Sequence, residues 1–200
     1  MGLELPSYYV KTMSDFMRAN VMGEAKVNSM GRDSMGGAQN LAQNSAHNLT
    51  SQEYAKMEEF VKLSFDFARV DDFQSLKIML DNGLNPNLAN HRGNTLLMLA
   101  SYHNALYCVK LLLDFGANVD KPNDKGHTPL AGVCFKGYIE VARLLLEAGA
   151  NPNGFGGALS PINTAIMFRK KQILALLLQY SNTKLPLWKR LYAKVTKLGV

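Results

Sequence analysis

The sequence has few cysteines, no long hydrophobic run and almost no charge imbalance outside its last segment. Its two cysteines, Cys108 and Cys134, are too few for a disulfide framework or a cysteine-rich zinc site, and reduced thiols favour the cytoplasm. No apolar run approaches the roughly 18 residues that a membrane-spanning helix needs. The N-terminus lacks a basic segment followed by an unbroken apolar stretch, so we expect no secretory signal.

The net charge of +6 is concentrated at one end of the chain. Residues 1–50 carry four basic and four acidic side chains, residues 51–182 carry thirteen and twelve, and residues 183–200 carry five and none. A nearly neutral body leaves no basic stripe of the kind that nucleic-acid binding requires. We therefore expect no nucleic-acid partner.

A period of 33 residues governs the middle of the chain. Glycines mark it at Gly83, Gly116 and Gly149, within the related segments LDNGLNPN, LDFGANVD and LEAGANPN. A second marker keeps the same phase, with GNTLLMLA from Gly93 and GHTPLAGV from Gly126, and a third copy, ALSPINTA, comes one residue early. Two independent markers at one period predict a stacked array of equivalent units.

Each copy predicts two short helices. Thr95, Thr128 and Ser160 can accept hydrogen bonds from the free amides at a helix start, and a proline follows two of them. A leucine-rich second helix ends at the repeated glycine, which suits the left-handed conformation of a helix end. One such pair buries too little apolar surface to stand alone, so several copies must stack. We identify three well-marked units, another at about residues 57–90 and a truncated one beginning near Pro186.

One unit resembles the ankyrin-repeat family closely: GHTPLAGVCFKGYIEVARLLLEAGANPN. That family's 33-residue repeat begins a helix with Thr-Pro-Leu-His and ends one with Leu-Leu-Leu-x-x-Gly-Ala. The resemblance covers roughly residues 60–182, within a domain of about four repeats that we place at residues 51–182. It implies an all-α fold, an ankyrin-repeat solenoid of stacked helix-turn-helix units with hairpin loops.

The sequence departs from the family's pattern at two kinds of position. The family's histidine is replaced by Met98, Ala131 and Asn163, so the hydrogen bonding that this histidine gives between loops is expected to be absent. The fourth copy places Lys171 where the other copies have an apolar residue. We therefore expect the outer flank of that copy to be less covered.

The two ends of the chain lie outside the periodic region. Residues 1–50 show no sustained helical or strand period and are expected to form a mobile N-terminal arm, whose apolar patch includes Tyr8 and Phe16 and is able to fold over the domain. A long helix is predicted at about residues 51–69. Residues 183–200 predict a cationic amphipathic helix that caps the last repeat. The alternative is peripheral attachment to an anionic membrane, which we consider less favoured because an uncapped end exposes apolar surface.

The sequence shows no constellation of catalytic or metal-binding side chains. None of the four histidines has a His or Cys at ligand spacing, and the common metalloprotease, hydrolase and phosphate-binding motifs are missing. Cys108 and Cys134 are interpreted as small core residues, and adjacent acids such as Asp71 and Asp72 as solvated charge. We therefore predict no enzyme activity, no cofactor and no metal, which leaves recognition as the function.

In the resembled family, partners bind along the concave face, formed by the hairpin tips and the end of each first helix. Transferring these positions implies partner-binding residues at the helix ends and at the tips: Tyr102, His103, Phe135, Lys136, Met167 and Phe168, with His91, Arg92, Asn94, Asp124, Lys125 and His127. Aromatic and methionine side chains recur at the helix ends, and such side chains dominate interface energies. We therefore predict a non-catalytic protein-protein interaction module.

Two segments, NTLLMLASYHN and TPLAGVCFKGY, are also similar to small bacterial ankyrin-repeat proteins, some of which are encoded beside catalases. This resemblance implies, as an alternative, an accessory role in catalase maturation or haem handling, with a catalase-like enzyme as partner. His103, His91 or Tyr102 would be the candidate axial groups, and no spacing singles one out. The identity of the partner and the oligomeric state stay open.

Overall fold

The computed structural model describes residues 51–155 and 160–181, with side-chain positions from Glu58 onward. Its helices are α3 (Ser51–Val70), α4 (Phe73–Asp81), α5 (Leu96–Tyr102), α6 (Leu106–Asp114), α7 (Pro129–Lys136), α8 (Ile139–Glu147), α9 (Pro161–Met167) and α10 (Lys171–Tyr180). Strand-like pairing in these ranges is limited to one isolated antiparallel bridge, Ala89 to Thr95. The predicted all-α fold of paired short helices is confirmed.

Three predictions fall on residues that the structure does not describe. They are the N-terminal arm at residues 1–50, the cationic helix at residues 183–200 and the truncated unit near Pro186.

The chain divides into two compact units, and the first contains most of α3 and α4. Its described residues are 51–66 and Gln74–Asn85. Both helices contribute buried apolar side chains: Phe60, Phe65, Leu76, Met79 and Leu80. The buried Ser64 hydroxyl donates a hydrogen bond to the carbonyl of Val61 at 2.6 Å. Its burial therefore does not leave an unsatisfied donor that would lower the stability of the fold. The helix predicted at about residues 51–69 is confirmed and extends one residue further.

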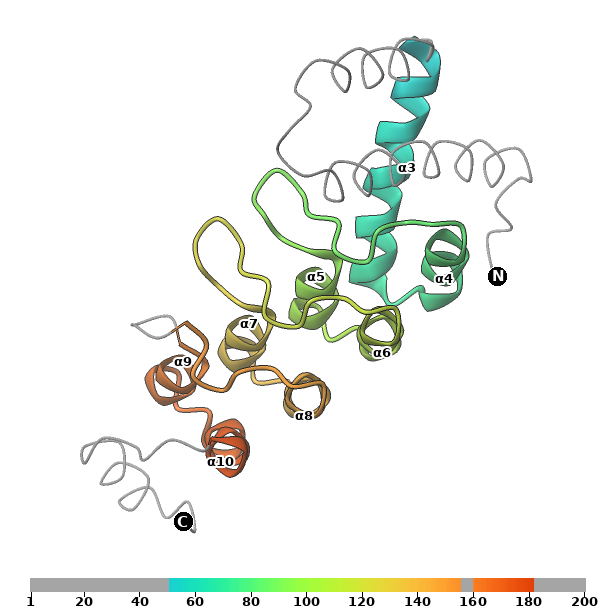
Figure 1. Ribbon diagram of the computed structural model, residues 1–200. Helices are drawn as coiled ribbons and strands as arrows, with labels where there is room; N and C mark the ends of the chain where they lie inside the picture. Colours follow the sequence, from blue (N-terminus) through green and yellow to red (C-terminus); the bar gives the residue numbers. More distant parts are fainter. Residues whose placement is uncertain (1–50, 156–159, 182–200) are drawn as a thin grey trace, which may run out of the picture. The chain divides into compact units, whose positions relative to one another are not determined.

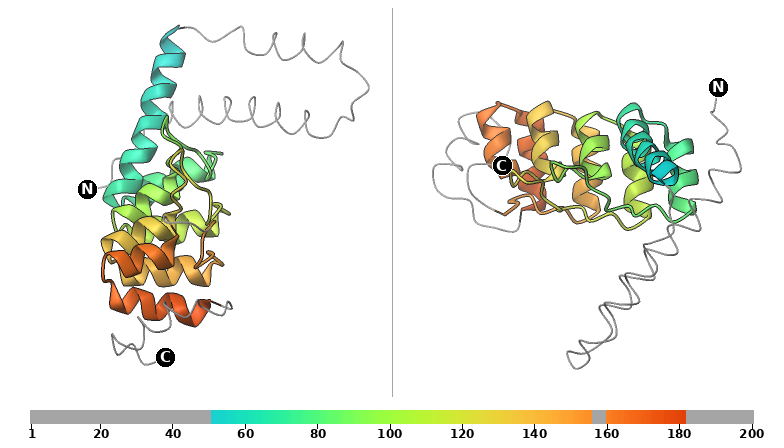
Figure 2. Two further views of the ribbon diagram at one scale, coloured as in Figure 1. Left: turned by 90° about the vertical axis from the view of Figure 1, so that its left-hand side faces the viewer. Right: turned by 90° about the horizontal axis from the view of Figure 1, so that it is seen from above.

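The second unit comprises Phe67–Phe73 and the chain from Pro86 onward, and its described helices form two rows. One row contains α5, α7 and α9, and the other contains α6, α8 and α10 (Figure 1, Figure 2). Neighbouring helices pack within each row, and each first helix also packs on its own second helix. The largest side chains in this core are fully buried: Leu97, Leu112, Leu130, Leu145, Ile162 and Leu177. Full burial of each contributes about 1.5–3 kcal/mol, so stacking the copies supplies the stability that one pair lacks.

The predicted helix starts are confirmed at the atomic level. The side-chain oxygens of Thr95, Thr128 and Ser160 accept hydrogen bonds from backbone amides three residues later, at 3.1, 3.2 and 3.2 Å. Pro129 and Pro161 occupy the first turn of their helices, where a missing N–H costs nothing. These caps satisfy amides that a helix start otherwise leaves free, so each first helix begins at a fixed residue.

Asp71 corrects one sequence interpretation. We expected its carboxylate to be solvated, but its two oxygens accept hydrogen bonds from the backbone amides of Cys108 at 2.8 Å and Tyr107 at 3.4 Å. These amides lie in the first turn of α6, whose own N-cap residue, Ala105, makes no side-chain cap. A negative charge at a helix start is favourable, so Asp71 caps α6 from a position 37 residues earlier in the chain.

The loops are joined by amide side chains, although the family's histidine is missing. The Nδ2 of Asn123 donates to the Oδ1 of Asn94 at 2.8 Å and links two successive loops. The backbone amide of Asn118 donates to the Oδ1 of Asn87 at 2.7 Å, and one copy later that of Asn151 donates to the carboxylate of Asp120. Hydrogen bonding between loops therefore persists in this chain through Asn and Asp residues.

We expect the substitution Asp71→Ala to lower the free energy of unfolding by about 2 kcal/mol, because it removes a helix cap and places alanine at a residue with a φ of 61°. The control Asp71→Asn keeps an acceptor oxygen and tolerates this conformation, so it should cost clearly less. Urea denaturation of the full chain, followed by circular dichroism, measures both values. Equal losses in the two variants would contradict the capping role.

Candidate partner-binding surface

The predicted helix-end residues lie at equivalent places on α5, α7 and α9. Tyr102 is the last residue of α5 and His103 is its C-cap. On α7, the corresponding residues are the last two of the helix, Phe135 and Lys136. Met167 ends α9, followed by Phe168 as the C-cap. All six residues are exposed, so the stack presents one such pair per copy.

Three of these side chains form a continuous row of rings, which we call the aromatic strip: Tyr102, Phe135 and Phe168. The rings of Tyr102 and Phe135 are nearly parallel, with centroids 6.5 Å apart, and the ring of Phe168 meets that of Phe135 edge-on at 4.6 Å. The three residues remain 37%, 40% and 44% exposed. Both arrangements are favourable for aromatic pairs, so the strip is ordered by contacts among its own members while its outer surface stays open.

Two registers disagree about which residue of the fourth copy joins the strip. Counted from the helix cap, Met167 follows Ser160 by the same seven residues that separate Tyr102 from Thr95, whereas the 33-residue period leads from Tyr102 through Phe135 to Phe168. The structure brings Phe168 against Phe135, and Met167 stays 62% exposed. The one-residue offset of the fourth copy thus adds an aromatic ring to the strip and leaves the methionine beside it.

His103 and Lys136 both lie against the Tyr102 ring of the strip. The Nζ of Lys136 lies 4.5 Å from the centre of the Tyr102 ring, and the His103 ring meets Tyr102 edge-on at 5.9 Å. Partial burial lowers the pKa of His103 below its ordinary value, and the charges of Arg69 and Lys136 lower it further. The imidazole therefore stays neutral at physiological pH, and the fixed positive charge at this position comes from Lys136.

The predicted tip residues lie in a separate place, in the loops that precede α5 and α7. Four of the tip residues are exposed: His91, Arg92, Asp124 and Lys125. Asn94 and His127 are half-buried. The Oδ1 of Asn94 accepts a hydrogen bond from the Nδ2 of Asn123, and the backbone amide of His127 donates to the Oδ1 of Asn123. The backbone amide of Asp124 donates to the carbonyl of Arg92 at 3.3 Å, which holds the two tips together. The tips precede the start of α5 and α7, whereas the strip lies at the ends of these helices, so the two groups are at opposite ends of each first helix.

Two cationic residues near the strip were missed by the sequence interpretation. Lys170 donates from its Nζ to the carbonyl of Lys136 at 3.2 Å and so reaches from the fourth copy to the third. Arg169 is exposed and has a left-handed φ of 54°, where the preceding copies have Asn104 and Gly137. The sequence did contain a signal for Arg169, because the turn position that holds Asn104 and Gly137 in the preceding copies holds neither Asn nor Gly in the fourth. Lys171 is exposed, whereas Leu106 and Ile139, which hold its position in the preceding copies, are half-buried.

The described residues contain no cluster of three or more His, Cys, Asp or Glu side chains that would hold a metal ion. Cys108 and Cys134 are buried, and burial raises the pKa of each thiol well above its ordinary value; the Asp71 carboxylate adds to the effect at Cys108. The interpretation of both as core residues is confirmed. No helix in the described ranges is long and apolar enough to cross a membrane.

We expect Lys136→Gln to raise the pKa of His103, because it removes a positive charge that disfavours the imidazolium. Burial and Arg69 would still keep this pKa below the ordinary histidine value. An NMR titration of the histidine Cε1 protons measures the change. Lys125→Gln, at a loop tip, is the matched control and should leave His103 unaffected; an equal shift in both variants would argue against a local cause.

We expect Arg169→Gly to raise the free energy of unfolding by up to about 1 kcal/mol, because glycine adopts the left-handed conformation without the steric penalty of an L side chain. Arg169→Ala removes the same charge but keeps the penalty, so it should not stabilise. Thermal or urea unfolding of the full chain compares the two. Stabilisation by both variants would point to charge repulsion rather than backbone strain.

Comparison with known proteins connects this geometry with a family. Residues 65–155 match the family model described as ankyrin repeats, in three copies. A Pseudomonas aeruginosa protein named as an ankyrin repeat protein is 56% identical over 46 residues, which are 23% of this chain and 27% of that protein. The match thus covers about a quarter of the relative's length, and it says nothing about what the rest of that protein does.

Proposed function

The chain carries ankyrin repeats over residues 65–155, and on this premise we propose that it is a non-catalytic binding module whose protein partner lies on the aromatic strip. Ankyrin repeats are generally protein-interaction modules. The observation that carries the proposal is a row of three exposed, mutually packed rings across α5, α7 and α9. Tyrosine and phenylalanine are enriched at interfaces, where a few such side chains supply most of the binding energy.

Packing of the helices does not explain why the strip is aromatic. The core under these helices is filled by other side chains of the same segments, such as Leu97, Leu130 and Ile162, which are fully buried. Small or polar residues at the strip positions would leave that core intact. Exposed rings across three successive copies therefore have a use outside the fold, and contact with another molecule is the use that their chemistry supports.

The order of the strip also favours binding. A side chain that becomes fixed on association costs about 0.5–1.5 kcal/mol in conformational entropy. Ring contacts already restrict Tyr102, Phe135 and Phe168, so a partner meets a partly ordered surface. We place the exposed Met167 beside this strip as an adaptable contact, and we place the loop-tip residues, including Arg92 and Lys125, at the polar rim.

We expect the combined substitution of Tyr102, Phe135 and Phe168 by Ser to abolish capture of the partner, because it removes all three rings of the strip. The chain should stay folded, since these side chains lie outside the fully buried core, although the loss of the ring contacts should lower the unfolding temperature modestly. The measurement is affinity purification of the full chain from its native lysate, followed by mass spectrometry.

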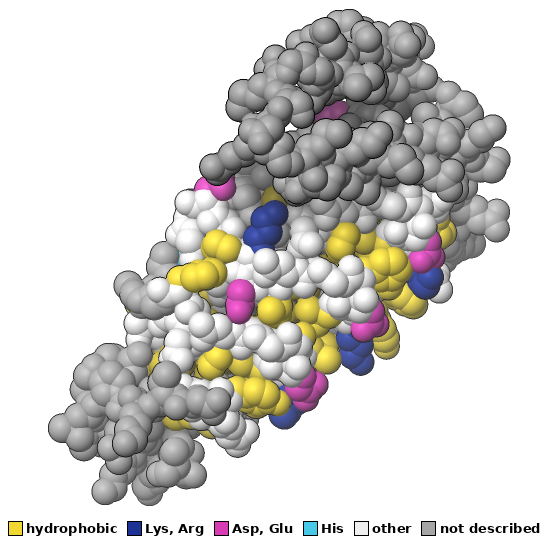
Figure 3. All heavy atoms as spheres, in the orientation of Figure 1, with side chains coloured by type: hydrophobic (Ala, Val, Ile, Leu, Met, Phe, Trp, Pro, Cys, Tyr) yellow, Lys and Arg dark blue, Asp and Glu magenta, His cyan; other side chains and the backbone are white. Residues whose placement is uncertain are grey.

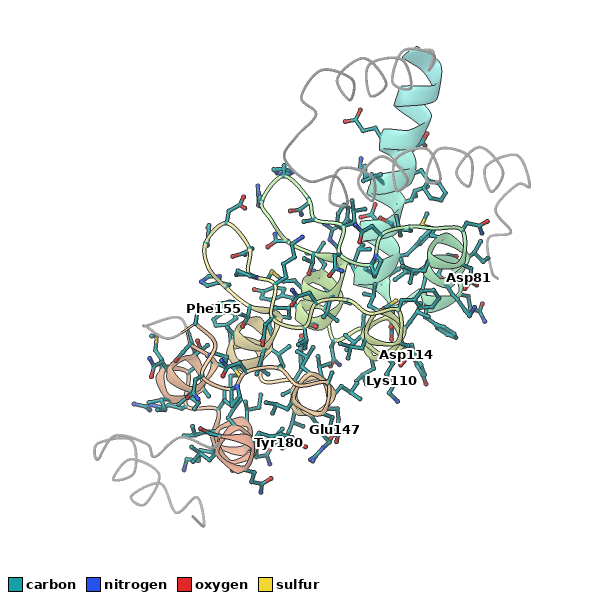
Figure 4. The ribbon with its side chains drawn as sticks, in the orientation of Figure 1. Asp81, Lys110, Asp114, Glu147, Phe155 and Tyr180 are labelled. Atoms are coloured by element: carbon teal, nitrogen blue, oxygen red, sulfur yellow. The ribbon has the colours of Figure 1, made fainter. Side chains whose placement is uncertain are left out.

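A matched control also replaces three exposed aromatic residues by Ser, but at positions outside the strip. Tyr107, Phe155 and Tyr180 are exposed aromatic residues, and Figure 4 shows Phe155 in the loop before α9 and Tyr180 at the end of α10. Replacing all three by Ser should leave the captured proteins unchanged. If the strip variant captured the same proteins as the wild type, or if both triple variants lost them, the assignment of the surface would be wrong.

A further inference from the structure

The fourth-copy end of the strip is surrounded by positive charge. Phe168 is followed directly by Arg169, Lys170 and Lys171, and Lys136 lies in the adjacent copy beside Phe135. Arg169, Lys171 and Lys136 are exposed, and Lys170 is half-buried. Among the described residues, no carboxylate forms an ion pair with any of these four side chains. Within residues 51–155 and 160–181, the strip therefore ends in a group of cations without an ion-paired carboxylate, which we call the basic end.

The flank formed by the second helices differs in this respect. Figure 3 shows acidic and basic side chains next to one another along α6 and α8, and Figure 4 labels Lys110, Asp114 and Glu147 there. The guanidinium of Arg143 on α8 also lies 3.9 Å from the carboxylate of Glu140. Charge on that flank is neutralised locally. The unbalanced charge is thus a feature of the basic end and not of the repeats in general.

Two of the cations in the basic end are held in place by the strip and its turns. Lys136 lies over the ring of Tyr102. Lys170 donates to the carbonyl of Lys136, and its side chain packs so closely over Gly137 that an added Cβ there would lie 3.0 Å from its Nζ. The ammonium of Lys136 thus lies at the Tyr102 end of the strip and that of Lys170 at the turn of the third copy, while Arg169 and Lys171 supply the charge that follows Phe168.

The other two cations have no structural role among the described residues. Arg169 occupies a left-handed turn position that arginine disfavours, and its side chain extends outward. Lys171 is the first residue of α10, where the helix dipole is already positive and no acidic side chain is present in the first turn. The placement of Lys171 is electrostatically unfavourable in the isolated fold, and a bound anionic group would relieve that repulsion.

We propose that the basic end recognises an acidic segment of the partner, in which carboxylates face Arg169, Lys170 and Lys171 while a neighbouring aromatic or aliphatic side chain packs on Phe135 and Phe168. This inference rests on the proposed function, since it names the kind of chain that the strip binds. The guanidinium of Arg169 suits a carboxylate because the two groups form paired, charge-assisted hydrogen bonds. The rings of Phe135 and Phe168 lie close together, so they offer a contact surface for one apolar side chain of the partner that is flanked by acidic residues.

A nucleic acid fits the same surface less well. Asp71 in the second unit holds the turn position that Asn104, Gly137 and Arg169 hold in later copies, and Asp72 follows it. Asp71 is engaged in capping α6, Asn104 and Gly137 are uncharged, and positive charge in this row is confined to the last turn. A phosphate backbone carries negative charge throughout and needs a continuous basic surface, whereas a short acidic segment matches cations confined to one end.

Selection from a displayed library of random peptides, with the full chain as bait, tests the inference without knowledge of the natural partner. We expect recovered peptides to combine Asp or Glu with Phe, Tyr, Trp or Leu. A synthetic fluorescent copy of a recovered peptide should bind more weakly as salt concentration rises. Its dissociation constant should increase roughly tenfold or more in the double variant Arg169→Glu, Lys171→Glu, which reverses two charges at the basic end.

The matched control reverses two charges on the neutralised flank, with Lys110→Glu and Arg143→Glu, and should leave peptide affinity unchanged. Recovery of apolar peptides without acidic residues would overturn the acidic preference but would leave the proposed function standing. Undiminished binding of the same peptides to the Tyr102, Phe135 and Phe168 variant would instead remove the proposed function itself.

Two other occupants are distinguished in the same experiment. If a single-stranded oligonucleotide displaced the fluorescent peptide and bound more tightly, in a manner lost in the Arg169→Glu, Lys171→Glu variant, the occupant would be nucleic acid and the inference would be wrong. If peptides were recovered only after Tyr8 and Phe16 were replaced by Ser, the occupant would be this chain's own N-terminal segment. Either result would show that the occupant of the basic end is not an acidic segment of a partner.

Discussion

Burial of leucine rows between successive helix pairs is the constraint on which the second unit depends. A single pair, such as α7 with α8, has apolar side chains on the faces toward both neighbouring copies, and those side chains are fully buried only because neighbours are present. Since each copy repeats the same packing, the residues at each helix end return at a regular interval. Residues that recur with the period of the sequence therefore line up along the stack, and the aromatic strip is one such row of side chains.

The copies differ most where packing constrains them least. The turn between paired helices needs one left-handed residue, and the four copies supply Asp71, Asn104, Gly137 and Arg169. The first of these caps the next copy's α6, while glycine at the third admits the side chain of Lys170. Arginine at the fourth does neither. A fixed backbone requirement has thus been met by four side chains with different chemistry, and this variation sets the charge along the face.

Local interactions were predictable from the sequence, and distant ones were not. The caps at Thr95, Thr128 and Ser160 act within three residues, so residue type and position were enough to place them. The cap from Asp71 to Cys108 spans 37 residues, and the bond from Asn123 to Asn94 spans 29, so each depends on how copies stack. The 33-residue period leads from Tyr102 and Phe135 to Phe168, but the cap at Ser160 comes one residue early and points to Met167, so three-dimensional packing decides between the two.

Rings and cations contribute to recognition in different ways. The rings are restrained by one another, so they offer apolar area at little entropic cost, and burying that area governs how slowly a partner dissociates. Exposed charges act over a longer range and mainly affect the rate of encounter and the rejection of partners with the wrong charge. His103 lies beside Tyr102, and its lowered pKa favours the neutral imidazole. The positive electrostatic potential near the strip therefore comes from side chains that stay cationic, such as Lys136 and Arg169. Selectivity that arises from this surface therefore weakens as ionic strength rises, because salt screens exposed charges.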